Sequence, residues 1–382
     1  MSGTKKVAIC GFYGNYNLGD EAMLTGMLNL LKKQSDELSF VVFSSDPKDT
    51  QNRYKVQTVH RLAGNLRCKF QRFLQILESQ YFILGGGDLL RDSLQSSVAS
   101  SWLQTLQQAL NFNCKTIVLG VSVGDIWREE TKALITKTLN RVDFLAVRDA
   151  QSKCKLEELG VKKTIHIISD LALEALPQFS QSESIPNKPL QIGVSVRHLS
   201  NRGSSVDIDT YPTLQKEIAS TIDFLIEHYG VVAHFLPLRT FKDQYHHTDD
   251  DYVSSLGVLR HSRFSSNCVV HRYFESVEAL STRIGSLDMM IGMRLHSLIL
   301  AAGAGIPVIG LEYDPKVGGF MAEINQSELA IPIREFESEK SLPKITKVLD
   351  DLPKARLSVQ DGIEVYKQKR SKARESLLEL FS

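Results

Sequence analysis

The sequence has almost no net charge and no long hydrophobic run. Its 45 Lys and Arg residues nearly balance its 44 Asp and Glu residues, which gives a formal charge of +1 over 382 residues. A chain this close to neutral has no overall field that attracts nucleic acid, so no nucleic-acid partner is expected and any anion site must be a local cluster. The longest apolar run, residues 298–311, is interrupted by Gly303, Gly305 and Pro307 and is shorter than the ~18–20 residues that span a membrane.

Cysteine is also scarce and scattered. None of the five cysteines has the Cys-x-x-Cys spacing of a zinc or redox site, and their odd number argues against a disulfide framework. This usage is typical of a reducing compartment. The short apolar run before Gly11 is expected to form a strand rather than a signal peptide. The expected location is therefore the cytoplasm, with the inner face of the membrane as a more specific alternative.

Length and composition predict an enzyme of two ordinary domains. A content of 42% hydrophobic and 23% charged residues is typical of a soluble globular enzyme, and 382 residues suffice for two cores. Patterns of buried strands alternate with helical patterns in both halves, which predicts two doubly wound α/β domains. The polar, proline-bearing residues 176–189 are the best linker candidate. We expect an N-terminal domain over residues 1–175, a C-terminal domain over residues 190–345 and a helical tail over residues 346–382.

The stretch over residues 287–317 has the pattern of a strand, a helix and a second strand. Arg294 and His296 follow the first strand, and Asp314 and Lys316 follow the second. In open parallel sheets, ligands bind at the carboxyl ends of the strands. Arg294 and His296 also stand at the start of a helix, where unpaired N–H groups and the dipole favour anions. We therefore predict a site for a small, highly charged anion.

A loop rich in glycine and asparagine, residues 11–21, follows the first strand of the chain. A strand, such a loop and a helix start suggest a backbone cradle for a ligand. The glycine spacing fits neither the dinucleotide fingerprint nor the P-loop, so nicotinamide cofactors and ATP are excluded and no cofactor is expected. Two interpretations of Asp20 and Glu21 remain open. They are either acids that stabilise the helix dipole, or a ligand for sugar hydroxyls or a general base.

Two further strand ends carry candidate ligand residues. Three glycines, residues 85–87, follow one strand, and their lack of Cβ atoms lets a ligand approach the backbone. Asp88 comes directly after them. Arg148 follows another strand. For Arg148, a local ion pair with the adjacent Asp149 and a role in ligand binding are equal alternatives.

Two other segments have a structural interpretation beside a functional one. Residues 65–79 predict a basic amphipathic helix, for which packing on the core is favoured over peripheral contact with a membrane surface. His246 and His247, with three aspartates at residues 249–251, could coordinate a metal. A solvated loop is favoured there because no other ligand spacing supports a metal site. No metal is therefore expected.

Several of these segments together resemble the polysaccharide pyruvyltransferase family. Their most specific part is Arg-Leu-His at residues 294–296 followed by Asp-Pro-Lys at residues 314–316. The resemblance implies two Rossmann-like domains facing a cleft, glycosyltransferase-B-like, with the acceptor on the N-terminal side and the donor on the C-terminal side. It implies phosphoenolpyruvate as donor, a glycan or lipid-linked glycan as acceptor, and a cyclic pyruvate ketal and phosphate as products. The matching segments are residues 11–21, 85–89, 146–149, 292–296 and 313–316.

The resemblance also assigns roles to individual residues. Phosphoenolpyruvate carries a phosphate and a carboxylate, and arginine can bind either group bidentately. Ketal formation needs a general acid and a general base, and His296 is expected to assist the departure of phosphate. The candidate bases are Asp20, Glu21, Asp88 and Asp92. The residues implied in donor binding are Arg148, Arg294, His296 and Lys316, those implied in catalysis are His296, Arg294 and Asp20, and those implied in further substrate binding are Asn15, Asn17, Gly86, Gly87 and Asp88.

Other interpretations of these residues and of the function remain. His296 is alternatively a buried histidine bound to a backbone carbonyl, and Arg294 a structural ion pair. A nucleotide-sugar-dependent glycosyltransferase of the same architecture would use two closely spaced glutamates, but Glu312 and Glu323 are too far apart. A non-catalytic glycan-binding protein is the second alternative. An arginine at a cleft carries little of a core, so Arg294→Ala is expected to lower turnover about 30-fold without unfolding the protein.

Overall fold

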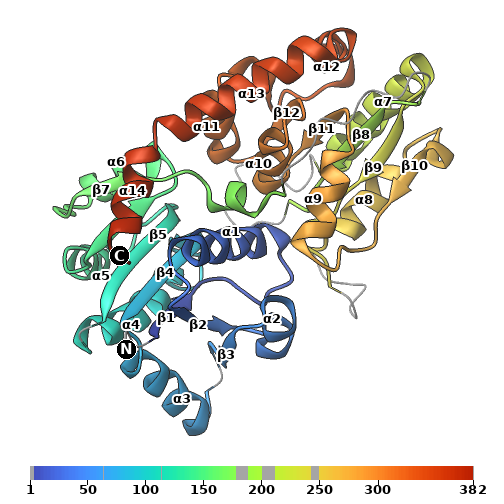
Figure 1. The fold of residues 1–382 in the computed structure, drawn as a ribbon. Coiled ribbons are helices and arrows are strands. Elements are labelled where there is room, and N and C mark those ends of the chain that lie inside the picture. Colours follow the sequence, from blue (N-terminus) through green and yellow to red (C-terminus); the bar gives the residue numbers. More distant parts are fainter. Residues whose placement is uncertain are drawn as a thin grey trace. The chain divides into compact units, whose positions relative to one another are not determined.

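The computed structural model describes residues 4–62, 64–112, 114–177, 188–199, 211–241 and 249–381. They form two compact units, which we call unit 1 and unit 2 (Figure 1). Unit 1 comprises Met1–Ala175 and Lys369–Ser382, and unit 2 comprises Leu176–Gln368. Each unit is built around one parallel β-sheet that carries helices.

Unit 1 contains a seven-stranded sheet in the order β3-β2-β1-β4-β5-β6-β7. Its neighbouring strands are all parallel. The strand order reverses between β1 and β4, and this kind of switch point is where open α/β sheets bind ligands. The elements are β1 (Lys5–Cys10), α1 (Leu18–Gln34), β2 (Leu38–Ser44), α2 (Pro47–Tyr54), β3 (Gln57–His60), α3 (Leu66–Leu77), β4 (Tyr81–Leu90), α4 (Val98–Asn111), β5 (Lys115–Val123), α5 (Glu129–Leu139), β6 (Phe144–Val147), α6 (Ala150–Glu158), β7 (Ile165–Ile167) and, from the end of the chain, α14 (Ser371–Glu379).

Helices cover both faces of the sheet in unit 1. Ile76 of α3, Leu103 of α4 and Ile135 of α5 join one buried core with side chains of the strands. Helix α1 covers the opposite face (Figure 1), where Met27 packs beside Gly85. Because both faces are buried, β1 and β4 are nearly continuous apolar runs rather than alternating ones.

Strand β4 extends further than the sequence predicts. The glycines after Leu84 were expected to follow the strand, but β4 continues through them to Leu90. Its register with β5 shifts between Gly87 and Leu90, which is the signature of a bulge. Gly86 and Gly87 have φ values of +74° and +89°, which residues with a Cβ atom rarely adopt. The glycines therefore bend the strand towards its carboxyl end instead of terminating it.

Unit 2 repeats the arrangement with a six-stranded parallel sheet in the order β10-β9-β8-β11-β12-β13, which reverses between β8 and β11. The expected strand–helix–strand segment is present as β11, α10 and β12, with Met290 opposite Val308. Two doubly wound α/β units confirm the expected fold class. Its elements are β8 (Gln191–Ser195), α7 (Tyr211–Tyr229), β9 (Val232–Phe235), α8 (Asp251–Leu259), β10 (Cys268–Val270), α9 (Val277–Gly285), β11 (Met289–Gly292), α10 (Leu295–Gly303), β12 (Val308–Glu312), α11 (Pro315–Glu323), β13 (Ala330–Pro332), α12 (Ser338–Asp350) and α13 (Leu352–Gln368).

Three short edge strands are not predicted by the sequence. Strands β3 and β10 have partly exposed residues, and β13 ends in Pro332. An edge strand pairs on one side only, so it lacks the continuous apolar run that marks an interior strand. Among the helices of the described residues, none combines the length and the apolar character needed to cross a bilayer.

The expected separate tail over residues 346–382 is wrong. Helix α13 belongs to unit 2, whereas α14 belongs to unit 1. The end of the chain is attached there by specific contacts. Arg374 Nε lies 3.2 Å from Glu174 Oε1, and the Tyr81 hydroxyl donates to the carbonyl of Leu380 over 2.9 Å. The Phe381 ring also packs on Tyr81, with centroids 4.5 Å apart. The last helix is therefore part of the first domain.

Candidate active site

Arg294 stands at the carboxyl edge of the sheet in unit 2, as the residue that precedes α10. Its Nε donates to both carboxylate oxygens of Asp251, over 2.9 and 3.1 Å. Its Nη2 donates to Asp251 Oδ1 over 2.5 Å and to Asp249 Oδ1 over 3.2 Å. Burial alone would lower the pKa of Arg294, but the two carboxylates raise it above its ordinary value. Arg294 is thus a buried, fixed cation, and within the described residues its Nη1 donates no hydrogen bond.

The three aspartates at residues 249–251 are buried, so the expected solvated loop is wrong. Asp251 Oδ2 also accepts hydrogen bonds from the backbone N–H groups of Leu238 and Arg239, over 3.1 and 2.9 Å. Asp250 caps α8 and is 1% exposed. These aspartates are buried because arginines from other segments of the chain pair with them. The polar local sequence does not reveal this burial. His246 and His247 lie outside the described residues, and within these residues no cluster of three or more His, Cys, Asp or Glu could hold a metal.

Three arginines converge on Asp249. Arg239 forms an ion pair with it, and Arg197 Nη2 and Arg294 Nη2 lie 3.7 and 3.2 Å from Oδ1. Burial alone would raise the pKa of Asp249, but Arg294, Arg239 and Arg197 lower it. With Asp251, the group has three cations and two carboxylates. We call Arg197, Arg239, Arg294, Asp249 and Asp251 the arginine cluster.

Sequence reasoning missed Arg197 and Arg239, although a signal was present. Each comes shortly after a buried strand, β8 or β9, at the edge where Arg294 follows β11. The rule that ligands bind at the carboxyl ends of parallel strands therefore applies to all three. Their side chains are 21% and 18% exposed, compared with 11% for Arg294. Arg197 and Arg239 are thus the more accessible members of the arginine cluster.

Tyr313 and Lys316 extend the arginine cluster along the same edge. The Tyr313 hydroxyl accepts a hydrogen bond from Arg197 Nη1 over 2.9 Å, and Lys316 Nζ lies 5.7 Å from the centre of its ring. Burial alone would raise the pKa of Tyr313, but Lys316, Arg197 and Arg294 together lower it. Lys316 also pairs with Asp314, which caps α11. His296, half-buried, lies in the first turn of α10. This edge therefore combines anion-binding groups with a phenol that is easier to deprotonate.

In unit 1, the loop after β1 gathers several of the predicted residues. Asn17 caps α1, accepting a hydrogen bond from Gly19, and its Nδ2 donates to Asp20 Oδ2 over 2.5 Å. Asp20 Oδ1 would lie 2.8 Å from a Cβ at position 87, so Gly87 lets the loop and β4 meet. Asn15 donates from Nδ2 to the carbonyl of its own loop, at residue 13, over 3.2 Å. Asn17, Asp20 and Gly87 therefore form one small polar group at the switch point.

Glu21 holds this loop in place through hydrogen bonds. Its carboxylate accepts hydrogen bonds from the backbone N–H of Gly14, over 2.8 Å, and from the Tyr54 hydroxyl, over 2.6 Å. Burial raises the pKa of Glu21 above its ordinary value, although these hydrogen bonds lower it. Glu21 is only 5% exposed. Its buried carboxylate therefore supports the loop.

Arg148 is buried at the end of β6, and its ion-pair partner is Asp170. Arg148 Nη1 lies 3.2 Å from Asp170 Oδ2, and Nη2 donates to the Ser122 hydroxyl. Of the two alternatives for Arg148, the local ion pair with Asp149 is not formed as such, because Asp149 caps α6 by accepting the N–H of residue 152 over 2.7 Å. Burial alone would lower the pKa of Arg148, but Asp170, Asp149 and Asp88 raise it. Asp88 thus lies close enough to interact with Arg148.

Asp92, a candidate base, is a structural clamp. It accepts hydrogen bonds from the backbone N–H groups of Trp127 and Arg128, over 3.0 and 2.9 Å, and from the Thr131 hydroxyl over 2.9 Å. Burial alone would raise the pKa of Asp92, but these hydrogen bonds lower it. Asp92 therefore fixes the loop after β5. The predicted site residues are thus divided, with Arg294, His296 and Lys316 in unit 2 and the others in unit 1.

Two doubly wound units with polar loops at the switch points of their sheets define the glycosyltransferase-B-like class, and solved structures agree. A glycosyltransferase from Rickettsia africae ESF-5 superposes with a TM-score of 0.61 at 12% identity, covering 98% of this chain and 99% of that chain. A UDP-GlcNAc 2-epimerase from Neisseria meningitidis bound to UDP-GlcNAc gives a TM-score of 0.60 at 9% identity, covering 99% and 100%. At these identities the likeness shows the fold.

The profile of the Polysaccharide pyruvyl transferase family matches residues 17–315, and the chain belongs to this family. A similar curated protein is the amylovoran biosynthesis protein AmsJ of Erwinia amylovora, 23% identical over 406 residues, or 94% of this chain and 95% of that protein. The matched region contains Asp20, Arg148, Arg294 and His296. The expected family is therefore confirmed, and the chain is a transferase of polysaccharide biosynthesis with a glycan as acceptor.

Proposed function

We propose that this chain transfers the pyruvyl group of phosphoenolpyruvate to two hydroxyls of one glycan, forming a cyclic ketal and releasing phosphate. The convergence of Arg197, Arg239 and Arg294 on Asp249 is the observation that carries the choice of donor. Phosphoenolpyruvate places a phosphate and a carboxylate on one small enol, so it needs several cations within a short distance. Arginine binds both kinds of group bidentately.

The arginine cluster suits this donor because its cations are held in advance. Asp251 fixes Nε and Nη2 of Arg294, so this guanidinium loses little side-chain freedom when a ligand binds. Arg197 and Lys316 retain exposed fractions of 21% and 25% and can reach an anion. His296, in the first turn of α10, adds a donor where the helix dipole favours negative charge. We also assign Arg148 of unit 1 to donor binding.

The reaction adds one proton to the methylene carbon of the donor and removes one proton from each of the two glycan hydroxyls. The methylene carbon of the enol takes a proton and becomes a methyl group, which leaves an oxocarbenium-like centre. One glycan hydroxyl adds to that centre, and a second hydroxyl then replaces the phosphate as its C–O bond breaks. One hydroxyl proton balances the proton at the methyl group, and the other leaves with phosphate. We propose that Tyr313, whose pKa is lowered, and His296 carry out these proton transfers.

We assign the acceptor to the loops of unit 1. The polar group of Asn17, Asp20 and Gly87 offers amide and carboxylate oxygens, which accept hydrogen bonds from sugar hydroxyls. Gly86 and Gly87 also leave the backbone open to a close approach. Asp20 is the carboxylate that we propose as the base for the attacking hydroxyl, and Asp88 and Asn15 extend the same edge.

The fate of the methylene carbon tests this function. The reaction is run in D₂O with phosphoenolpyruvate and a glycan terminated by a hexose or an amino sugar. Ketal formation should give a methyl group with one deuterium, one released phosphate and one added carboxylate per acceptor. Retention of a vinylic CH₂ would identify enolpyruvyl transfer instead, and modification of the acceptor without consumption of phosphoenolpyruvate would refute the donor.

A matched pair of variants connects this reaction to the arginine cluster. Arg197→Met and Arg356→Met each remove one guanidinium from unit 2. Arg356 pairs with Asp288 outside the arginine cluster. Arg197→Met should abolish the thermal shift that phosphoenolpyruvate produces, and Arg356→Met should retain it. Equal responses of both variants, or a shift with UDP-GlcNAc in place of phosphoenolpyruvate, would contradict the assignment.

A further inference from the structure

Helix α3 of unit 1 presents a row of large apolar side chains to solvent. Leu66, Phe70, Phe73 and Leu77 are 84%, 60%, 39% and 51% exposed, and we call these four residues the α3 stripe. On a helix with about 3.6 residues per turn they fall within roughly 60° of one another. The expectation that this helix packs its apolar side on the core is therefore wrong. Ile76 is the residue of α3 that is buried.

The α3 stripe is held in place by Ile76, which lies about 90° around the helix from its centre, and by Phe73 of the stripe itself. Ile76 is 0% exposed, and its carbonyl accepts a hydrogen bond from the Cys114 thiol over 3.2 Å. The helix begins at a cap, because Asn65 accepts the N–H of residue 68 over 2.8 Å. The ring of Phe73 makes an edge-to-face contact with Phe112, with centroids 5.0 Å apart. The stripe is thus a fixed surface of unit 1, next to β3 and α4 (Figure 1).

The charged residues within α3 are all positive, and Glu78, the acid that directly follows the helix, pairs with Lys6. Residues 61–77 contain three arginines and one lysine and no Asp or Glu. Helical spacing places Lys69 and Arg67 on the two flanks of the stripe, and both are exposed. A helix with apolar residues on one side and cations along that side's borders is typical of segments that lie in a membrane interface.

We propose that α3 docks this protein onto a bilayer that contains anionic phospholipid. The Leu and Phe side chains of the α3 stripe enter the boundary between headgroups and acyl chains, and Arg67 and Lys69 meet lipid phosphates. A second copy of the chain fits this surface less well. A two-fold contact through the stripe would bring the same cations of both copies together, and like charges oppose that pairing. This docking goes beyond the transfer reaction and does not depend on it.

Vesicle flotation of the full chain tests the proposal. Vesicles of phosphatidylcholine alone are compared with vesicles that also contain phosphatidylglycerol. The wild type should float with the anionic vesicles only, and less as salt rises. Leu66→Gln/Phe70→Gln removes apolar insertion and should weaken binding at least about tenfold. Arg67→Gln/Lys69→Gln should weaken it roughly 25-fold, or about fivefold for each charge near the surface.

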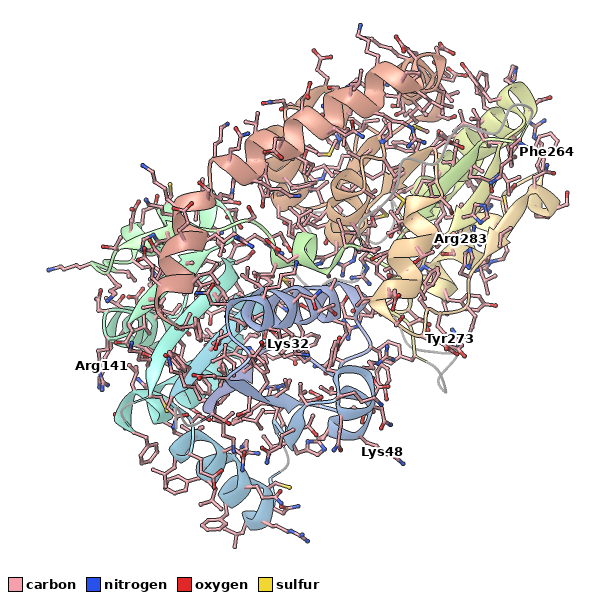
Figure 2. All side chains as sticks on the ribbon, in the orientation of Figure 1. Lys32, Lys48, Arg141, Phe264, Tyr273 and Arg283 are labelled. Carbon is pink, nitrogen blue, oxygen red and sulfur yellow. The ribbon has the colours of Figure 1, made fainter. Side chains whose placement is uncertain are left out.

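The control variant removes two cations elsewhere on unit 1. Lys32 and Lys33 lie at the end of α1, which covers the other face of the sheet; Figure 2 labels Lys32. Lys32→Gln/Lys33→Gln should float like the wild type, and every variant should keep the wild-type unfolding temperature and response to phosphoenolpyruvate.

Three results would overturn the proposal. The first is a wild type that does not float with anionic vesicles. The second is binding that Leu66→Gln/Phe70→Gln leaves unchanged. The third is a concentration-dependent dimer, measured by sedimentation, that this variant abolishes, because a second copy would then cover the α3 stripe.

Discussion

Replacing Arg294 with methionine should destabilise unit 2 strongly, whatever it does to catalysis. The buried guanidinium makes three hydrogen bonds to Asp251 and one to Asp249. Removing one partner of a buried ion pair leaves an uncompensated charge and costs about 3–5 kcal/mol. In a domain of this size each kcal/mol lowers the unfolding temperature by about 2–4 °C, so a fall of about 6–20 °C is expected. This replaces the sequence-based expectation that Arg294→Ala leaves the fold intact.

A double-mutant cycle separates the ion pair from other effects of the substitution. Asp251→Asn removes the charge but keeps an acceptor for the backbone N–H groups of Leu238 and Arg239. If the pair is what matters, Arg294→Met/Asp251→Asn should lose less free energy of unfolding than the sum of the single variants. The expected coupling is about 2 kcal/mol, within the range for residues in direct contact.

The positions of the tryptophans make the assay specific for one unit. Trp102 and Trp127, the two tryptophans of the sequence, both belong to unit 1. Tryptophan fluorescence therefore follows unit 1, whereas far-ultraviolet circular dichroism follows both units. Arg294→Met should leave the fluorescence transition in place and move part of the dichroism transition to lower temperature.

A surface pair in the same unit provides the control. Arg356 and Asp288, 3.1 Å apart, have side chains that are 32% and 28% exposed. Arg356→Met should therefore cost less than about 1 kcal/mol. Equal stabilities of Arg294→Met and Arg356→Met, or strictly additive free energies in the cycle, would refute the reasoning.

Transfer from phosphoenolpyruvate should survive exhaustive EDTA, because arginine and lysine neutralise the donor; a loss that Mg²⁺ or Mn²⁺ restores would contradict this. Tyr313→Phe should lower kcat about 100-fold and remove the alkaline fall that loss of the phenol proton causes, and an unchanged pH profile would argue against the role. Burial, with Arg283 and His271, lowers the pKa of His234 from 6.5 to about 4. The unfolded chain then binds more protons than the folded one between these values, so unit 2 should lose up to about 3 kcal/mol as pH falls through them. Urea unfolding should show that His234→Gln removes most of this loss; the same pH slope in the variant would exclude His234 as its cause.

The sequence predicts those parts of the candidate site that depend on one strand end at a time. Arg294, His296 and Lys316 follow buried strands, and the general position of ligands in parallel sheets is enough to assign them to one edge. Arg197 and Arg239 satisfy the same rule. They are missed because no family-like motif surrounds them.

Reasoning from one strand end at a time does not predict which distant segments pair with each other. Arg148 has an aspartate directly beside it in sequence, yet it pairs with Asp170, because capping of α6 uses Asp149. The aspartates at 249–251 have the local composition of a solvated loop and are buried by arginines from three other segments. Amphipathic spacing likewise predicts α3 itself but does not tell whether the core covers its apolar side. Each of these outcomes depends on tertiary contacts that local composition does not encode.

The return of the chain to unit 1 determines how the molecule would respond to a mechanical load. Residues from both ends of the chain belong to unit 1, and Lys5 Nζ lies 3.5 Å from the carbonyl of Phe381. A pull applied at the two ends is therefore borne first by the contacts of α14 with Tyr81 and Glu174. Unit 2, inserted between the two parts of unit 1, carries no tension until α14 has come away. Proteolytic removal of the last helix would take away this protection, and the same pull would then pass through unit 2 from the start.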